Sequence, residues 1–251
     1  MALITGLVGA WEMDEASGQA LDSHGSNPLT DVNTVGSNGS GWRDFESDNV
    51  ESFSHIDNAD LSTGDIDFSV AADVQLESKG NDRAIAMKWD GSGTEWILWF
   101  DNAGNFGTAD RFSFVIHNGV TVVAVTANNF GSPALGTPYH IVARVNAATK
   151  GISITVNNGT PNTNTYSSHV FDTNSAFNVG SDGAGSTLWD GLMRRLRFWK
   201  KNLTDDEVTQ LYNGGAGMSY AAIVAESSGG SLGNLSPNRL RPRIFSPGLA
   251  R

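Results

Sequence analysis

The chain has 251 residues, a formal net charge of −11 and 29 glycines, and it contains no cysteine. Its length suits one large β domain or two small domains, and its glycine content is typical of short strands joined by tight turns. The acidic charge argues against nonspecific binding to nucleic acid, and the lack of cysteine excludes disulfides and thiolate metal sites. Because no stretch approaches the roughly 18 apolar residues of a membrane span, neither a nucleic acid nor a membrane is expected as a partner.

Ten short apolar or alternating segments predict β-strands. In chain order they are residues 7–13, 68–76, 83–89, 95–100, 111–116, 121–126, 139–145, 151–157, 176–181 and 192–199. Asn118-Gly119 and Asn158-Gly159 stand between neighbouring segments and are typical of hairpin turns. Many short strands with almost no helix predict an all-β fold, an antiparallel two-sheet sandwich.

One short helix is expected after the last strand, in TDDEVTQLYNGG. Thr204 is the predicted N-cap, and Glu207 three residues later completes a capping box. Leu203 and Val208 occupy the positions of a hydrophobic staple. Gly214 is expected to end the helix.

Three blocks of the sequence resemble the laminin-G-like, concanavalin-A-like jelly-roll domains. They are GLVGAWEMDEASGQALDSHGSN, DFESDNVESFSHIDNADLSTGDIDFSVAADVQLES and WDGLMRRLRFWKKNLTDDEVTQLYNGG. They are similar to the family's opening strand and loop, its next strands, and its closing strand and helix. The resemblance implies a jelly-roll domain over residues 1–220. That fold hosts lectins, adhesion modules, enzyme appendages and virion proteins, so the resemblance alone does not decide the function.

The closing strand region carries Arg194, Arg195, Arg197, Lys200 and Lys201. In the family, an acidic pair usually stands where this chain has Arg194 and Arg195. Strict alternation would place Arg194 on one face and Arg195 and Arg197 on the other, so either some arginines point across a sheet face or the strand is bulged. Two interpretations stay open: the bases neutralise an acidic sheet, or they form a docking patch for an acidic ligand or partner.

The loop DSHGSN offers the side chains of Asp22 and Asn27 and several carbonyl groups, which suits a hard cation such as calcium. The resemblance implies a structural calcium ion between this loop and an acidic residue of the closing strand. Arg194 occupies that acidic position and would oppose a cation, although Asp190 could substitute. The alternative is an Asx-type turn without metal, and no other cofactor is expected.

Glu46, Asp48 and Glu51 match the pattern E-x-D-x-x-E, which is similar to the retaining β-glucanases of the same general fold. Those enzymes need two carboxylates held close together. Here ESDN is typical of a turn, which favours an ordinary hairpin. The five histidines are scattered, and no nucleophile or phosphate-binding motif is present. We therefore expect no enzymatic activity.

The candidate carbohydrate-binding residues are Trp89, Asp90, Trp189 and Asp190. Each tryptophan precedes an Asp-Gly pair, which predicts a loop edge with an exposed aromatic face. Aromatic faces stack on sugar rings while carboxylates and amides bind hydroxyl groups. The tryptophans within residues 95–100 are instead expected in the core.

Residues 221–251 are expected to form an extended basic arm, because the sequence from Ser227 onward has no apolar periodicity. The segment carries +3, from four arginines and one glutamate, which leaves −14 for residues 1–220. The residues expected to mediate assembly are Arg239, Arg241, Arg243, Ile244, Phe245 and Arg251. We expect the arm to dock on a second copy or on another virion protein and give a homo-oligomer; the alternative is a frayed terminus.

Together these features favour a non-catalytic, lectin-like structural or adhesion protein that binds surface glycans or neighbouring virion proteins. A bacteriophage virion component, such as a capsid decoration or fibre protein, is the first expectation. The N-terminal MALITGLVGAWEMD has no basic leader typical of a signal peptide, which together with the arm and the lack of cysteine favours the virion. A secreted bacterial carbohydrate-binding lectin is the alternative, and a glycoside hydrolase is a distant third.

Overall fold

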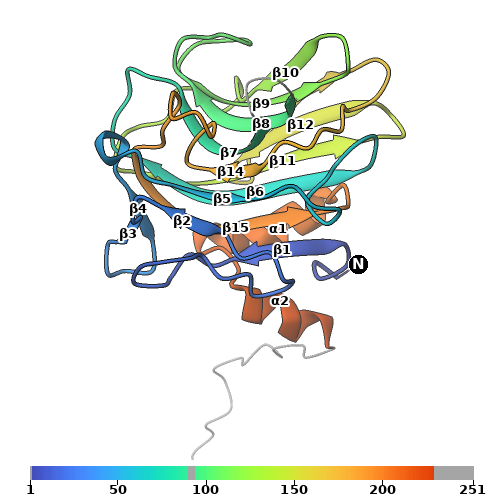
Figure 1. Ribbon diagram of the computed structural model, residues 1–251. Coiled ribbons are helices and arrows are strands. Elements are labelled where there is room, and N and C mark those ends of the chain that lie inside the picture. Colours follow the sequence, from blue (N-terminus) through green and yellow to red (C-terminus); the bar gives the residue numbers. More distant parts are fainter. Residues whose placement is uncertain (1, 90–93, 229–251) are drawn as a thin grey trace, which may run out of the picture.

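Two antiparallel sheets pack face to face in the computed structural model, which describes residues 2–89 and 94–228 (Figure 1). One sheet has eight strands in the order β13 (Asn162–Thr165), β12 (Gly151–Val156), β11 (Pro138–Asn146), β6 (Phe68–Leu76), β15 (Gly191–Trp199), β4 (Arg43–Phe45) and β3 (Gly36–Ser37), with β1 (Leu7–Trp11) paired to β15. The other has seven, in the order β10 (Val122–Thr126), β9 (Arg111–His117), β8 (Thr94–Asp101), β7 (Arg83–Trp89), β14 (Phe177–Val179), β5 (Ser52–His55) and β2 (Thr30–Val32). This is the predicted all-β jelly-roll sandwich.

All ten predicted strands are confirmed, and so is the hairpin at Asn118. The side-chain oxygen of Asn118 accepts hydrogen bonds from the backbone N–H groups of Val120 and Thr121, at 3.0 and 2.8 Å. Between β12 and β13, Asn157 and Asn158 adopt left-handed φ angles of 50° and 55°, which tight hairpin turns require. The strands that the sequence did not predict, β2 to β5 and β13, are short and lack an apolar alternation.

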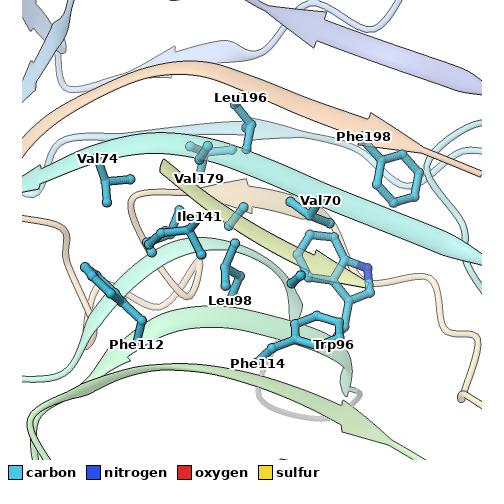
Figure 2. Close-up of a cluster of buried hydrophobic side chains, with 14 of the residues drawn as sticks. Val70, Val74, Trp96, Leu98, Phe112, Phe114, Ile141, Val179, Leu196 and Phe198 are labelled. Carbon is cyan, nitrogen blue, oxygen red and sulfur yellow. The ribbon is translucent and has the colours of Figure 1, made fainter. Parts of the chain in front are cut away.

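Inward-facing side chains from both sheets form one hydrophobic core (Figure 2). The eight-stranded sheet supplies Val70, Val74, Ile141, Leu196 and Phe198, and the seven-stranded sheet supplies Trp96, Leu98, Phe112, Phe114 and Val179. The rings of Trp96 and Phe198 stack across the interface with their centroids 6.2 Å apart. Burial of these large apolar side chains is the main term that stabilises the sandwich.

Strand β15 contains a β-bulge at Arg195. Its register with β6 shifts between Arg194 and Arg197, and Arg195 has a left-handed φ of 51°. A bulge inserts one residue and changes which face the following side chains occupy. Met193 and Leu196 therefore both point into the core. The bulged alternative of the sequence analysis is confirmed, and the three arginines share the outer face of the eight-stranded sheet.

Two of these arginines fasten the sheet to the C-terminal segment. The buried Arg197 donates to Glu12 Oε1 at 2.6 Å and to the carbonyl of Met218 at 2.7 Å. Arg195 donates to Asp73 Oδ2 at 2.5 Å through Nε and to the carbonyl of Ala216 at 2.7 Å. Residue 217 has a left-handed φ of 67°, which favours glycine at this position.

The capped helix α1 (Asp205–Tyr212) forms as predicted, with the Thr204–Glu207 capping box present. A 3-10 turn, η2 (Asn213–Gly215), follows it. The sequence did not predict the next element, helix α2 (Tyr220–Ser227), whose N-cap is Ser219. Ile223 of α2 is fully buried, in a second apolar cluster that also contains Leu211.

The predicted boundary at residue 220 is therefore wrong for residues 221–228. Apolar contacts of α2 extend the domain to the end of this helix. The rest of the predicted arm, with Arg239, Arg241, Arg243, Ile244, Phe245 and Arg251, lies outside the described residues. Among the described helices, none has the length and apolarity needed to cross a membrane.

A buried ion-pair network lies beside the core. Lys88 Nζ contacts Asp57 Oδ1 at 2.6 Å and Glu95 Oε1 at 2.8 Å, and the side chains of Lys88 and Glu95 are fully buried. Glu95 also accepts hydrogen bonds from the backbone N–H and hydroxyl groups of Thr63 and Thr173. Charges are tolerated in a protein interior when they are paired and hydrogen-bonded in this way.

We expect Lys88→Met to destabilise the fold by about 3–5 kcal/mol, because it leaves the Glu95 charge buried without its cation. Chemical denaturation would measure the change in the free energy of unfolding. Lys150→Met is the matched control: its ion pair with Asp65 is solvent-accessible, so its loss should cost less than about 1 kcal/mol. Equal costs for the two variants would contradict this reading of the network.

Candidate functional site

A trough lies on the outer face of the seven-stranded sheet, opposite the face that packs in the core. Its cavity volume is about 250 Å³. Met87, Ile97 and Trp99 form an apolar cluster separate from the main core, and they line the trough together with Trp89 and Phe106. The remaining lining residues are polar: Asp82, Asn105, Asp182, Ser186 and Thr187. An apolar surface with a few polar groups around it is the usual composition of a small-ligand site.

The loop after β8 holds Phe106 over the sheet. The buried carboxylate of Asp101 accepts the backbone N–H groups of Gly104, Asn105 and Phe106 at 2.7, 2.9 and 3.1 Å. The Phe106 ring then packs against Trp99, with centroids 5.4 Å apart. These bonds fix the aromatic ring, so little conformational entropy is lost when a ligand binds to it.

The loop that precedes β15 supplies the opposite polar side. Asp182 accepts the backbone N–H groups of Ala184 and Ser186, both at 3.0 Å, and the Ser186 hydroxyl. Burial alone would raise the pKa of Asp182, but the hydrogen bonds from Ser186 and the loop backbone hold that pKa below its ordinary value. Asp182 therefore stays ionised and keeps the loop in one conformation. Trp99 Nε1 and Thr187 Oγ1 are buried without a hydrogen-bond partner among the described residues.

Of the four predicted carbohydrate-binding residues, the three that the structure describes do not come together. Trp89 is half-buried and lines the trough, whereas Asp90 lies outside the described residues. Trp189 is fully buried in the main core, so the prediction of an exposed loop-edge contact is wrong for it. The reason is the alternation of β15: residue 189 shares the inward parity of Met193.

Asp190 faces outward but already has partners. Its carboxylate accepts the backbone N–H of Ser47 at 3.2 Å and the Ser78 hydroxyl, and Arg83 lies 3.7 Å away. Burial raises its pKa, but the hydrogen bonds from Ser78 and Ser47 and the charge of Arg83 outweigh that effect and lower it. Asp190 thus anchors the segment before β15 and does not line the trough.

Sequence reasoning assigned Trp99 to the core and did not single out Phe106. The usable signal was parity: Trp96 and Trp99 lie three residues apart on β8, so alternation places them on opposite faces. Trp96 is in the main core and Trp99 is in the outer cluster. The position of Phe106 depends on a loop conformation that no periodicity predicts.

The loop proposed for calcium is an Asx-type turn in this structure. The Asp22 carboxylate accepts the backbone N–H groups of Ala10, His24 and Gly25, each at 3.0 Å, and of Asn27 at 3.1 Å. The side-chain oxygen of Asn27 instead accepts a hydrogen bond from Asn58 at 2.7 Å. The two expected ligand groups are thus turned toward donors, which fits a cation poorly, and calcium binding stays a prediction.

The candidate glucanase acids lie on a turn, as the sequence suggested, but the expected hairpin is wrong, because the flanking strands β4 and β5 belong to different sheets. Ser47–Asn49 is a 3-10 turn, and Glu51 accepts the backbone N–H of Glu46 at 2.9 Å. Glu46 also belongs to an acidic group with Asp44 and Glu77, whose carboxylate oxygens lie within 4.8 Å of one another. Burial, followed by repulsion from neighbouring acids, raises the pKa of Glu46 and of Glu77.

The chain belongs to the concanavalin A-like lectin/glucanases superfamily. The model of a laminin G family within this superfamily matches residues 46–209, which confirms the predicted family. No curated protein matches the chain significantly.

Solved structures of the same fold share little sequence with this chain. The binding domain of Paraclostridial Mosquitocidal Protein 1 matches with a TM-score of 0.61 at 13% identity, over 84% of this chain and 52% of that one. Domain 4 of AbnA, a GH43 extracellular arabinanase from Geobacillus stearothermophilus, in complex with arabinotriose, matches at 0.59 and 16%, over 81% and 96%. The binding domain of Botulinum Neurotoxin DC in complex with SialylT matches at 0.62 and 10%, over 84% and 52%. The chain thus spans about half the length of the two toxin binding domains. These similarities establish the fold alone.

The charges of Asp73 and Glu77 should affect the stability of the fold in opposite directions, one stabilising and the other destabilising at neutral pH. The hydrogen bond and charge of His140, with those of Arg195, outweigh the effect of burial and hold the pKa of Asp73 below its ordinary value of 3.8. Asp73 therefore stabilises the fold above that value, and this contribution is lost as the pH falls through the lower folded pKa. Glu77 has a raised pKa, so its charge destabilises the fold at neutral pH and protonation relieves this.

We expect Asp73→Asn to cost about 3–5 kcal/mol near neutral pH, because it leaves the charge of Arg195, whose side chain is largely buried, without its carboxylate. Glu77→Gln should stabilise by only a few tenths of a kcal/mol, since its carboxylate is exposed and screened. Urea unfolding across a pH series measures both. Each effect should shrink on acidification, and a gain from Glu77→Gln that grows as the pH falls would contradict the repulsion.

Proposed function

We propose that the protein is a carbohydrate-binding module and that the trough on the seven-stranded sheet binds the glycan. The observation that carries the proposal is the pairing of two half-buried aromatic rings, Trp89 and Phe106, with polar side chains in one cavity. Aromatic faces bind the C–H faces of sugar rings, while Asp82, Asn105 and Ser186 offer hydrogen bonds to hydroxyl groups.

The family and the fold support the same function. The superfamily comprises lectins and glucanases, and two similar structures were solved in complex with arabinotriose and with SialylT. We propose binding without hydrolysis. The candidate acids Glu46 and Glu51 do not line the trough, and the Glu51 carboxylate is occupied by the turn that it stabilises.

Trp89→Ala and Phe106→Ala should each weaken glycan binding by about 1–2 kcal/mol, a five- to thirty-fold loss, because each removes a stacking face. A glycan array would identify a ligand, and calorimetry would compare the variants. Phe171→Ala is the matched control, since this exposed ring packs on His117 and is not among the residues that line the trough. Mass spectrometry of the glycan after incubation should find it intact.

Unchanged glycan affinity in both trough variants would contradict the proposal that the trough binds the glycan. Shortened glycan products would instead show a hydrolase.

We further propose that the module acts on a bacteriophage virion, as a decoration or fibre protein, with a secreted lectin as the alternative. The support is the sequence of residues 229–251, where basic and apolar residues alternate with three prolines. Proline-rich sequences favour extended conformations and lose little entropy when they dock on a partner. The remaining chain is acidic, so a second copy or another virion protein offers a complementary surface.

A chain truncated after Ser228 should keep its fold but lose self-association, because helix α2 remains while the basic segment is removed. Light scattering would compare its mass with that of the full chain, and thermal melting would check the fold. Truncation after Met218 is the control, since it also removes Ile223 from the apolar cluster under the helices and should lower the melting temperature. Equal self-association of the full chain and the Ser228 truncation would rule out a role of the C-terminal segment in assembly.

A further inference from the structure

A row of polar side chains crosses the outer face of the eight-stranded sheet, on the opposite side of the sandwich from the trough. Arg194 on β15 is the cross-strand neighbour of Asp73 on β6, which in turn neighbours His140 on β11. Side chains in such positions touch. A cavity of about 80 Å³ opens over this row, and Trp42 and Tyr212 are among the residues that line it.

Arg194 is the cation of this row that lacks a full set of partners. Arg195 Nε donates a hydrogen bond to the Asp73 carboxylate at 2.5 Å, whereas Arg194 Nε lies 3.4 Å from the same carboxylate. No described residue accepts a hydrogen bond from the two terminal nitrogens of Arg194. The guanidinium lies 4.1 Å from the ring centroid of Trp42, and 28% of the side chain is exposed. A guanidinium that lies over an indole ring and leaves its terminal N–H groups without an acceptor among the described residues can bind a carboxylate through two hydrogen bonds.

His140 supplies a second unused group in the same cavity. Its Nδ1 lies 2.7 Å from Asp73 Oδ1, so Nδ1 carries a proton that it donates to the carboxylate, and Nε2 remains as a second atom able to form a hydrogen bond. Only 8% of the side chain is exposed, and Nε2 is buried without a partner. A buried polar atom without a partner is uncommon in native structures and costs stability until a group bonds to it. A hydroxyl group would satisfy it.

We infer that this cavity binds an acidic sugar, with the sugar carboxylate on Arg194 and a neighbouring hydroxyl on His140 Nε2. The volume is sufficient for the carboxylate and hydroxyl, while the rest of the ring would lie outside against Tyr212 and Pro138. The inference rests on the proposed function only for the choice of a glycan as the carrier of the carboxylate. The cavity shares no residue with the trough, so either site can fail alone.

Titration of the full chain with galacturonate, galactose and acetate tests the assignment. Nitrogen-15 NMR would follow the Arg194 Nε and Trp42 Nε1 signals. Galacturonate should shift both, galactose should shift neither, and acetate should bind at least tenfold more weakly than galacturonate because it lacks the hydroxyl. Acetate binding as tight as galacturonate, or no shift with galacturonate, would overturn the site.

Variants separate the binding role from folding. Arg194→Gln should weaken galacturonate binding about tenfold or more, the effect of losing one charged hydrogen-bonding partner. Arg194→Lys keeps the charge but removes the two-pronged geometry, so it should also weaken binding, and it carries the test if the glutamine variant is unstable. Lys150→Gln, which removes an exposed charge elsewhere, should leave galacturonate binding unchanged. If Lys150→Gln and Arg194→Gln lose equal galacturonate affinity, the effect comes from net charge alone and the proposal is wrong.

Discussion

The β-bulge at Arg195 determines what the outer face of the eight-stranded sheet can do. Strict alternation from the inward-facing Met193 would turn Leu196 outward and Arg195 and Arg197 inward. An arginine in the core would be very costly, because its charge would be unpaired there. With the bulge, Arg194, Arg195 and Arg197 all face outward. Two of them fasten the C-terminal segment through the carbonyls of residues 216 and 218. The bulge thus links the packing of the core to the attachment of the helices.

The two outer faces of the sandwich have different chemistry. The seven-stranded sheet presents an apolar cluster with Trp99 at its centre, flanked by loops that carboxylates hold in place. The eight-stranded sheet presents a row of ionic side chains under a small cavity. Apolar surface favours the faces of neutral sugars, and a free guanidinium favours an anion. The two proposed sites therefore differ in chemistry and lie on opposite sides of one fold.

The question raised by five basic residues in one strand region has a divided answer. Arg195 and Arg197 serve the scaffold, because each is paired with a carboxylate and a backbone carbonyl. Arg194 differs, since it shares a carboxylate that Arg195 already occupies and stacks on Trp42. Neutralisation, one of the two interpretations left open by the sequence, thus describes Arg195 and Arg197, whereas docking at Arg194 is a proposal.

The sequence by itself determined the sandwich, ten of its strands, the hairpin turns and helix α1, because period-two alternation, turn residues and a capping box are local signals. The alternation of inward and outward residues along each strand also predicts Trp189 inside and Trp99 outside, although the sequence analysis did not apply it to these two residues. Only the tertiary structure decided the candidate sites. Arg194, Asp73 and His140 come from three strands far apart in the chain, and strand pairing alone makes them neighbours. Helix α2 has a low amphipathic signal and depends on an apolar surface built from both ends of the domain, which no local pattern contains.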